Sequence, residues 1–110
     1  MAKSSPAVSA KQIETQVSMI LRKVQLHKLN RKEQNILTDL RQLLADARIY
    51  VGDYELSEMR DEQVDNAKKA KRYLAQARQL ILRASEFNIF GPVDVAHISA
   101  QIDQLTGDLK

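Results

Sequence analysis

Apolar residues recur in steps of three and four along most of this chain, which is the spacing of one face of an α-helix. The pattern predicts four helices, over about residues 10–29, 31–51, 58–86 (or 88) and 93–106. The connections between them are short, which favours antiparallel neighbours. We therefore expect an all-α fold. Its architecture is an antiparallel bundle of four helices with coiled-coil-like packing, a long third helix and a short fourth one.

Capping signals mark the predicted helix boundaries. Ser9 and Asn30 each precede a Gln or Glu by three residues, which is the spacing of a capping box at a helix N-terminus. Gly52 suits the left-handed position that ends a helix, and Ser57 is the next expected N-cap. Pro92 fits the first turn of the last helix, because its missing N–H has no partner there.

The 110 residues correspond to one domain of ordinary small size. We expect a flexible tail over residues 1–8 and a single helical-bundle domain over residues 9–110. No apolar run approaches the roughly 18 residues of a membrane span, and the first ten residues lack the apolar segment of a secretory signal. The chain has no cysteine, which fits a reducing compartment. These features predict a cytoplasmic protein without a transmembrane segment.

The predicted third helix carries a stripe of small residues. Ala70, Ala77 and Ala84 lie one heptad apart on its apolar side. Small side chains let two helix backbones approach closely, so this stripe predicts a tight seam within the bundle core. The opposite side of the same helix is cationic.

Charge is unevenly distributed along the chain. Five basic and no acidic residues lie between Arg22 and Lys32, around the first predicted turn. Six acidic residues and one arginine lie between Asp53 and Asp65, around the second turn. Antiparallel helices place these turns at opposite ends, so we expect one basic and one acidic end. The direction of the third helix is expected to bring Arg78 and Arg83 towards the basic end.

Basic residues form a candidate face for nucleic acid or another anion, as in a nucleic-acid- or ribosome-associated protein. Phosphate contacts require only cations within reach. The aromatic residues that single-strand binders place among their cations are missing, so a merely solvated face remains the alternative. The candidate residues are Lys28, Arg31, Lys32, Lys68, Lys71, Arg72, Arg78 and Arg83.

The sequence offers little catalytic chemistry. It contains no Gly-rich phosphate loop and no His-x-x-x-His pair. His27 and His97 are isolated, and the acids between Glu58 and Asp65 share one helix face without a histidine among them. Such acids are also typical of a stable helix start. We therefore predict no catalytic residue, cofactor or metal ligand, and a small helical enzyme ranks last among the interpretations.

Several apolar residues do not fit the predicted core stripes. Met19 and Leu26 lie one heptad apart on the outer side of the first helix, and Ile49 lies outside the stripe of the second. Leu56 and Met59 flank the acidic turn. Either the fourth helix and the aromatic loop before it cover these residues, or they bind a partner.

The favoured function is a non-enzymatic assembly or adaptor module that acts through helix–helix contacts with another protein or with a second copy as a homodimer. Its candidate partner surface comprises Met19, Leu26 and Ile49. Opposed basic and acidic ends would then orient an antiparallel dimer.

Overall fold

The computed structural model describes residues 5–109, which form four α-helices and one short 3₁₀ turn. The elements are α1 (Pro6–Arg22), η1 (Leu26–Lys28), α2 (Arg31–Leu56), α3 (Arg60–Ser85) and α4 (Pro92–Asp108).

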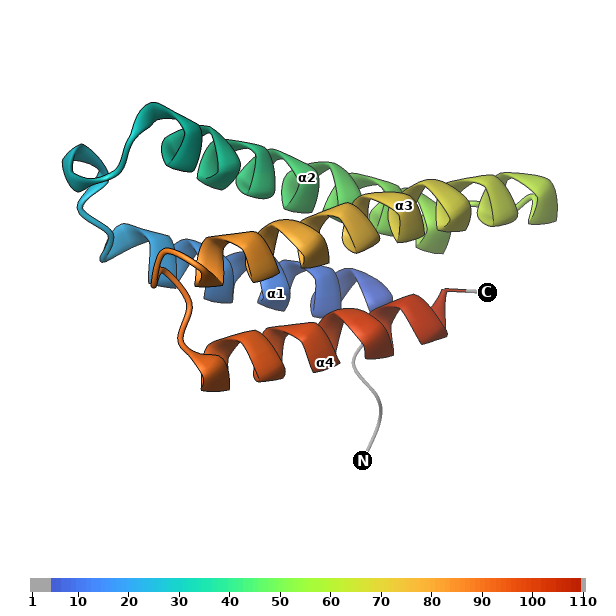
Figure 1. Ribbon diagram of the computed structural model, residues 1–110. Helices are drawn as coiled ribbons and strands as arrows, with labels where there is room; N and C mark the ends of the chain where they lie inside the picture. The colour runs from blue at the N-terminus through green and yellow to red at the C-terminus, as the bar shows by residue number, and fades with distance from the viewer. Residues whose placement is uncertain (1–4, 110) are drawn as a thin grey trace.

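Successive helices run antiparallel and close into a bundle (Figure 1). Helix α2 packs against both α1 and α3, and α4 folds back against α3 and α1. The molecule is elongated, with extents of 47 × 30 × 18 Å. The prediction of an all-α antiparallel four-helix bundle is confirmed.

Every α-helix contributes to one apolar core. Ile13 of α1, Leu40 of α2, Leu74 of α3 and Ile102 of α4 are all almost fully buried. Burying each such side chain contributes about 1.5–3 kcal/mol, so the core is the main source of stability. The small-residue stripe of α3 lies in this core, since the side chains of its three heptad-spaced alanines are inaccessible. That stripe serves internal packing.

Two predicted helix starts are confirmed. The Asn30 side chain accepts a hydrogen bond from the Glu33 amide at 2.8 Å, and the Glu33 carboxylate accepts one from the Asn30 amide at 3.0 Å. This is a complete capping box at the start of α2. Pro92 is the first residue of α4.

The prediction for the first helix is wrong at both ends. Helix α1 begins at Pro6, with Ser5 as the N-cap whose hydroxyl accepts from the Val8 amide. Ser9 lies inside the helix and its amide donates to the Ser5 carbonyl. A proline at the first helical position costs no hydrogen bond, so the helix starts there. Residues 6–8 are thus helical, and residues 1–4 of the expected tail lie outside the described residues.

A contact from α2 holds the turn that follows α1. The chain leaves the helix after Arg22 and forms the 3₁₀ turn η1. The Gln34 side-chain amide donates to the carbonyls of Leu26 and Leu29, at 2.8 and 2.9 Å. These bonds join the turn to the first turns of α2 and give the Leu29 carbonyl a partner.

The turn between α2 and α3 lies later in the chain than predicted. Gly52 is inside α2, which continues to Leu56 because Tyr54 packs against the core. Ser57 follows the end of α2 and its hydroxyl donates to the Asp53 carbonyl, so it does not cap α3. As a result α2 and α3 both have 26 residues, and α1 and α4 both have 17. The third helix is therefore no longer than the second.

Candidate partner-binding surfaces at the two ends of the bundle

The turn between α2 and α3 projects beyond the ends of α1 and α4 (Figure 1). We call the segment Asp53–Asp65 the acidic tip. Two of its apolar side chains are strongly exposed, Leu56 at 82% and Met59 at 62%. All six of its acidic residues are exposed as well.

Polar contacts hold the backbone of the acidic tip. The Gln63 side-chain amide donates to the Ser57 carbonyl at 2.9 Å, and that of Asn66 donates to the Ser57 hydroxyl at 3.3 Å. The turn therefore keeps its shape without burying Leu56 or Met59. An open hollow of about 520 Å³ lies between these two side chains.

Most of the tip carboxylates lack a cationic partner. Asp65 pairs with Lys69, with 3.1 Å between the ammonium nitrogen and the carboxylate oxygen. This hydrogen bond and the negative charge raise the pKa of Lys69. Lys69 also lies 5.4 Å from the ring centre of Tyr50, which stacks on Tyr73 and closes the α2–α3 seam. The other five tip acids form no ion pair with a described residue, but the Glu55 carboxylate accepts a hydrogen bond from the Ala7 amide of α1 at 3.0 Å. The charge of the remaining four is available to a partner.

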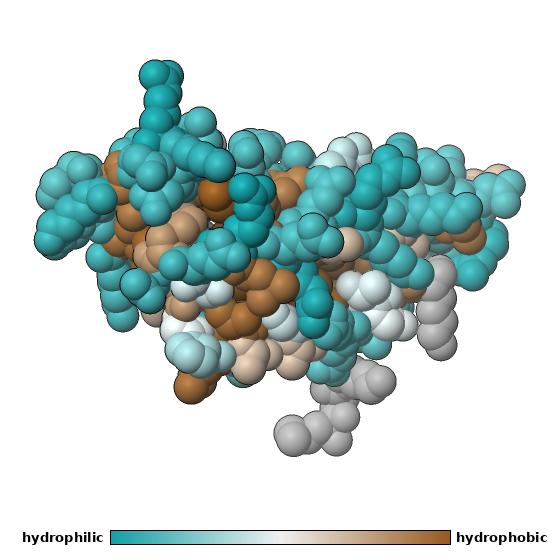
Figure 2. Space-filling model, viewed as in Figure 1, coloured by the Kyte–Doolittle hydropathy of each residue, from teal (hydrophilic) through white to brown (hydrophobic). Residues whose placement is uncertain are grey.

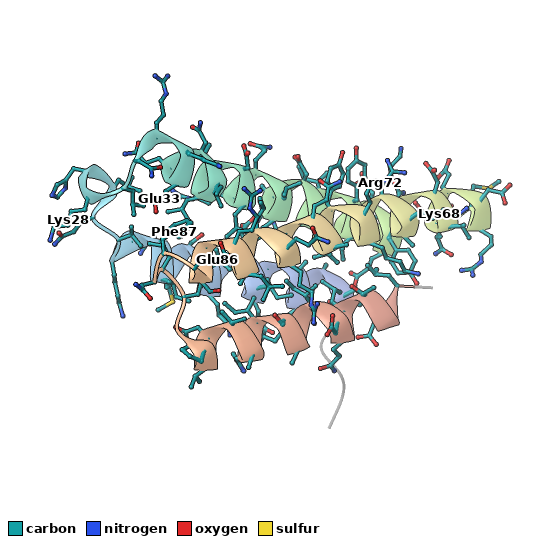
Figure 3. The ribbon with its side chains drawn as sticks, viewed as in Figure 1. Lys28, Glu33, Lys68, Arg72, Glu86 and Phe87 are labelled. Atoms are coloured by element: carbon teal, nitrogen blue, oxygen red, sulfur yellow. The ribbon has the colours of Figure 1, made fainter. Side chains whose placement is uncertain are left out.

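The opposite end of the bundle is cationic. We call the segment Arg22–Lys32 the basic end. All five of its basic residues are exposed. Figure 3 shows Lys28 of this segment at the far end of the molecule from Lys68 of α3. The antiparallel helices thus place the basic end and the acidic tip at opposite ends of the bundle.

A hollow of about 470 Å³ opens at the basic end. Its apolar lining comes from Ile20, Val24, Leu29 and Ile89, which are all half-buried against the core. The charged residues that line it are Lys23, Lys28 and Asp94. Figure 2 shows apolar atoms close to the hydrophilic outer rim at this end. We call this feature the basic-end hollow.

The α3–α4 loop builds one wall of this hollow. Asn88 adopts a positive φ of 65°, a left-handed conformation that asparagine tolerates better than most residues. The Ile89 amide then donates to the Ala84 carbonyl, and the Asn88 amide donates to the Ser85 carbonyl. These are the two bonds of a Schellman motif. The motif ends α3 and directs Ile89 back towards α1.

The predicted partner residues are exposed but lie in three different elements. Met19 of α1, Leu26 of η1 and Ile49 of α2 are 56%, 52% and 55% exposed. Neither α4 nor the aromatic loop covers them. The heptad relation between Met19 and Leu26 is wrong, because α1 ends at Arg22. Leu26 belongs to the basic end.

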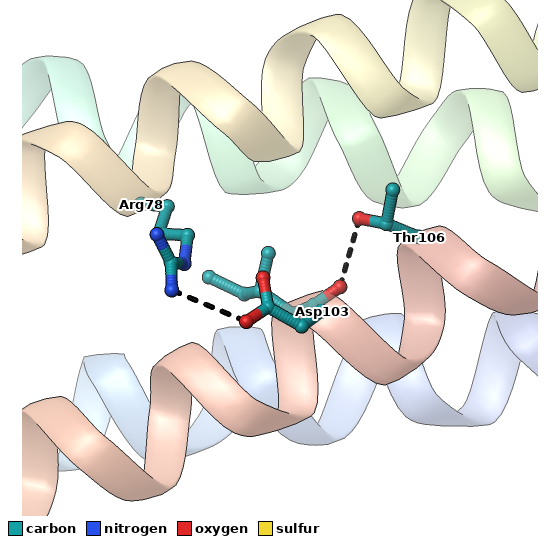
Figure 4. A network of polar contacts seen from close by, with 4 residues as sticks. Arg78, Asp103 and Thr106 are labelled. Carbon is teal, nitrogen blue, oxygen red and sulfur yellow. Dashed lines mark hydrogen bonds and ion pairs between the residues drawn. The ribbon is translucent and has the colours of Figure 1, made fainter.

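The predicted anion face is divided along the molecule. Lys28, Arg31 and Lys32 lie together at the basic end, whereas Lys68 and Arg72 lie on the half nearer the acidic tip (Figure 3). Lys71 is on that half too, and Arg83 is in the last turn of α3, towards the basic end. Arg78 pairs with Asp103 of α4 at 3.1 Å, beside a Thr106 hydroxyl that donates to the Ile102 carbonyl (Figure 4).

Other candidate chemistry is sparse in the described part of the chain. His27 and His97 are exposed and lie in different elements. Among residues 5–109, no group of three or more acidic, histidine or cysteine side chains is arranged to hold a metal ion. None of the described helices combines the length and hydrophobicity that a bilayer crossing requires.

Comparison with known proteins adds no functional information. No protein-family model matches the chain, and neither a curated protein nor a solved structure matches it.

Proposed function

We propose that this protein is a small non-enzymatic assembly or adaptor module that binds protein chains through the ends of its helical bundle. The observation that carries this proposal is the strong exposure of Leu56 and Met59 on a projecting turn. A single exposed apolar residue is common on soluble proteins and needs no explanation. Two of them three residues apart, on a turn whose shape does not depend on burying them, favour a contact surface.

The energy available from these two side chains sets a requirement on the partner. Fully burying a leucine or methionine contributes about 1.5–3 kcal/mol each. Association costs about 4–15 kcal/mol in lost freedom of motion. Leu56 and Met59 alone therefore do not suffice for a stable complex. The partner must also bring groups that interact with the tip carboxylates, which favours a cationic and partly apolar surface.

The proposal is tested by affinity capture from the cells that make the protein, with the full chain as bait. We expect wild-type bait to retain specific proteins that the Leu56→Ser/Met59→Ser bait loses. Leu82→Ser is the matched control, because Leu82 is an exposed leucine on α3 outside the acidic tip. Purified candidates are then tested for direct binding to the same three baits.

Two results would contradict the proposal. One is a capture profile that is identical for wild-type and tip-variant baits. The other is a capture that nuclease digestion abolishes, which would favour the nucleic-acid interpretation through the cations of the basic end.

A further inference from the structure

The two ends of this molecule are complementary in charge. The acidic tip carries six acidic residues and one arginine, and the basic end carries five basic residues and no acidic one. The ends lie on opposite sides of a bundle 47 Å long, so one molecule cannot bring them together.

The ends are also complementary in shape and polarity. Leu56 and Met59 protrude at the acidic tip with little contact to their own chain. The basic-end hollow presents half-buried apolar side chains, with Lys23 and Lys28 beside them. Its volume lies within the range of roughly 300–1,000 Å³ that is typical of ligand pockets. Two apolar side chains flanked by carboxylates match this lining.

We infer that the acidic tip of one copy docks into the basic-end hollow of a second copy, so that the protein assembles head to tail. This inference rests on the proposed function and identifies the partner as the same chain. Leu56 and Met59 would enter the hollow, and tip carboxylates such as Glu58 and Glu62 would meet Lys23 and Lys28. Asp94 is the one acid that lines the hollow, and the two lysines outnumber it.

Like-with-like contacts are disfavoured by the same charges. A symmetric contact between two tips would oppose twelve carboxylates, and a contact between two basic ends would oppose ten basic side chains. A head-to-tail contact is heterologous and leaves one free tip and one free basic end. Assembly therefore continues into a ring or an open chain.

The test uses two variants that each retain one half of the contact. Leu56→Ser/Met59→Ser removes the apolar pair of the tip, and Lys23→Glu/Lys28→Glu reverses the charge beside the hollow. All four residues are exposed, so we expect both variants to fold, with circular dichroism as the check. Sedimentation velocity in low salt then gives the species present for each variant alone and for an equimolar mixture.

The head-to-tail contact predicts a specific pattern. Wild type grows beyond a dimer as concentration rises, and each variant alone stays monomeric. The mixture forms a 1:1 heterodimer, in which the intact tip of one variant binds the intact hollow of the other. This heterodimer grows no further, because its free tip and its free hollow are both altered. Salt at about 1 M shortens the screening length to about 3 Å and dissociates the wild-type assembly. Leu82→Ser behaves as wild type.

Any of three results would overturn the inference. They are a wild type that is monomeric at every concentration, a mixture that remains monomeric, and a variant that still self-associates as wild type does. A side-by-side antiparallel dimer gives the last result, because its contact uses the flanks of the helices. If the inference fails while the tip variant still loses captured proteins, the proposed function stands with a different partner.

Discussion

At the scale of single residues, Gly52 is the clearest departure from what its type predicts. It lies inside α2 with a negative φ, although glycine usually marks a helix end. The helix passes through it because residues on both sides, Val51 and Tyr54, pack against the core. Tertiary packing thus outweighs a local preference of about 1 kcal/mol.

Replacing Gly52 should stabilise the protein. No atom lies within 4 Å of the position that a Cβ at residue 52 would occupy. Gly52→Ala should therefore raise the free energy of unfolding by about 1 kcal/mol, as measured by chemical denaturation. Gly91→Ala is the control, because Gly91 is the N-cap of α4, where alanine is a poor substitute. A Gly52→Ala variant no more stable than wild type would show that glycine does not weaken α2 at this position.

Ala77 tests the packing of the small-residue stripe. Its side chain is inaccessible to solvent, so leucine at this position must push the neighbouring helices apart. Ala77→Leu should lower the free energy of unfolding by about 1–3 kcal/mol. Ala75→Leu on the exposed side of α3 should change it little. Equal effects of the two substitutions would mean that the stripe does not form a tight seam.

At the scale of the elements, local signals predicted some boundaries and missed others. The Asn30–Glu33 pair was predictable because both partners of the capping box lie within four residues of each other. The turn after α1 was not predictable in this way, because it is held by Gln34 of α2, whose side chain bonds to the carbonyls of Leu26 and Leu29. Ser57 resembles an N-cap in sequence, but its hydroxyl is engaged by α2.

Asn30→Ala tests the capping box. The substitution leaves the Glu33 amide without its partner, so the first turn of α2 should fray. We expect a loss of about 1 kcal/mol in the free energy of unfolding, with faster hydrogen exchange at the Glu33 amide. Asn35→Ala in the same helix removes an exposed asparagine and should do neither. Unchanged exchange at Glu33 would show that the cap does not hold this turn.

At the scale of the whole molecule, the charge separation was predictable because it requires only charge counts and an antiparallel topology. The candidate partner surface was predicted only in part. Exposure of Met19 and Ile49 follows from helical spacing, whereas Leu26 is exposed because it lies in η1, outside α1. Leu56 and Met59 flank the acidic turn in the sequence. Their prominence depends on how far the α2–α3 turn projects, which spacing does not specify.

The basic-end hollow could not be predicted from the sequence. It arises where the early end of α1 and the Schellman motif at Asn88 bring residues from α1, the η1 region and the α3–α4 loop together. The Schellman bonds lie within residues 84–89, but the meeting of this loop with α1 depends on how the helices pack. Helical periodicity specifies which residues face the core, but it leaves the ends of a bundle undetermined.

Sedimentation of the wild-type protein decides whether the two ends of the bundle bind one another. The chain has a mass of 12.5 kDa. In low salt the weight-average mass should rise with concentration past that of a dimer, and in high salt it should fall back towards the monomer. A single monomeric species at every concentration in low salt would show that the ends do not bind one another.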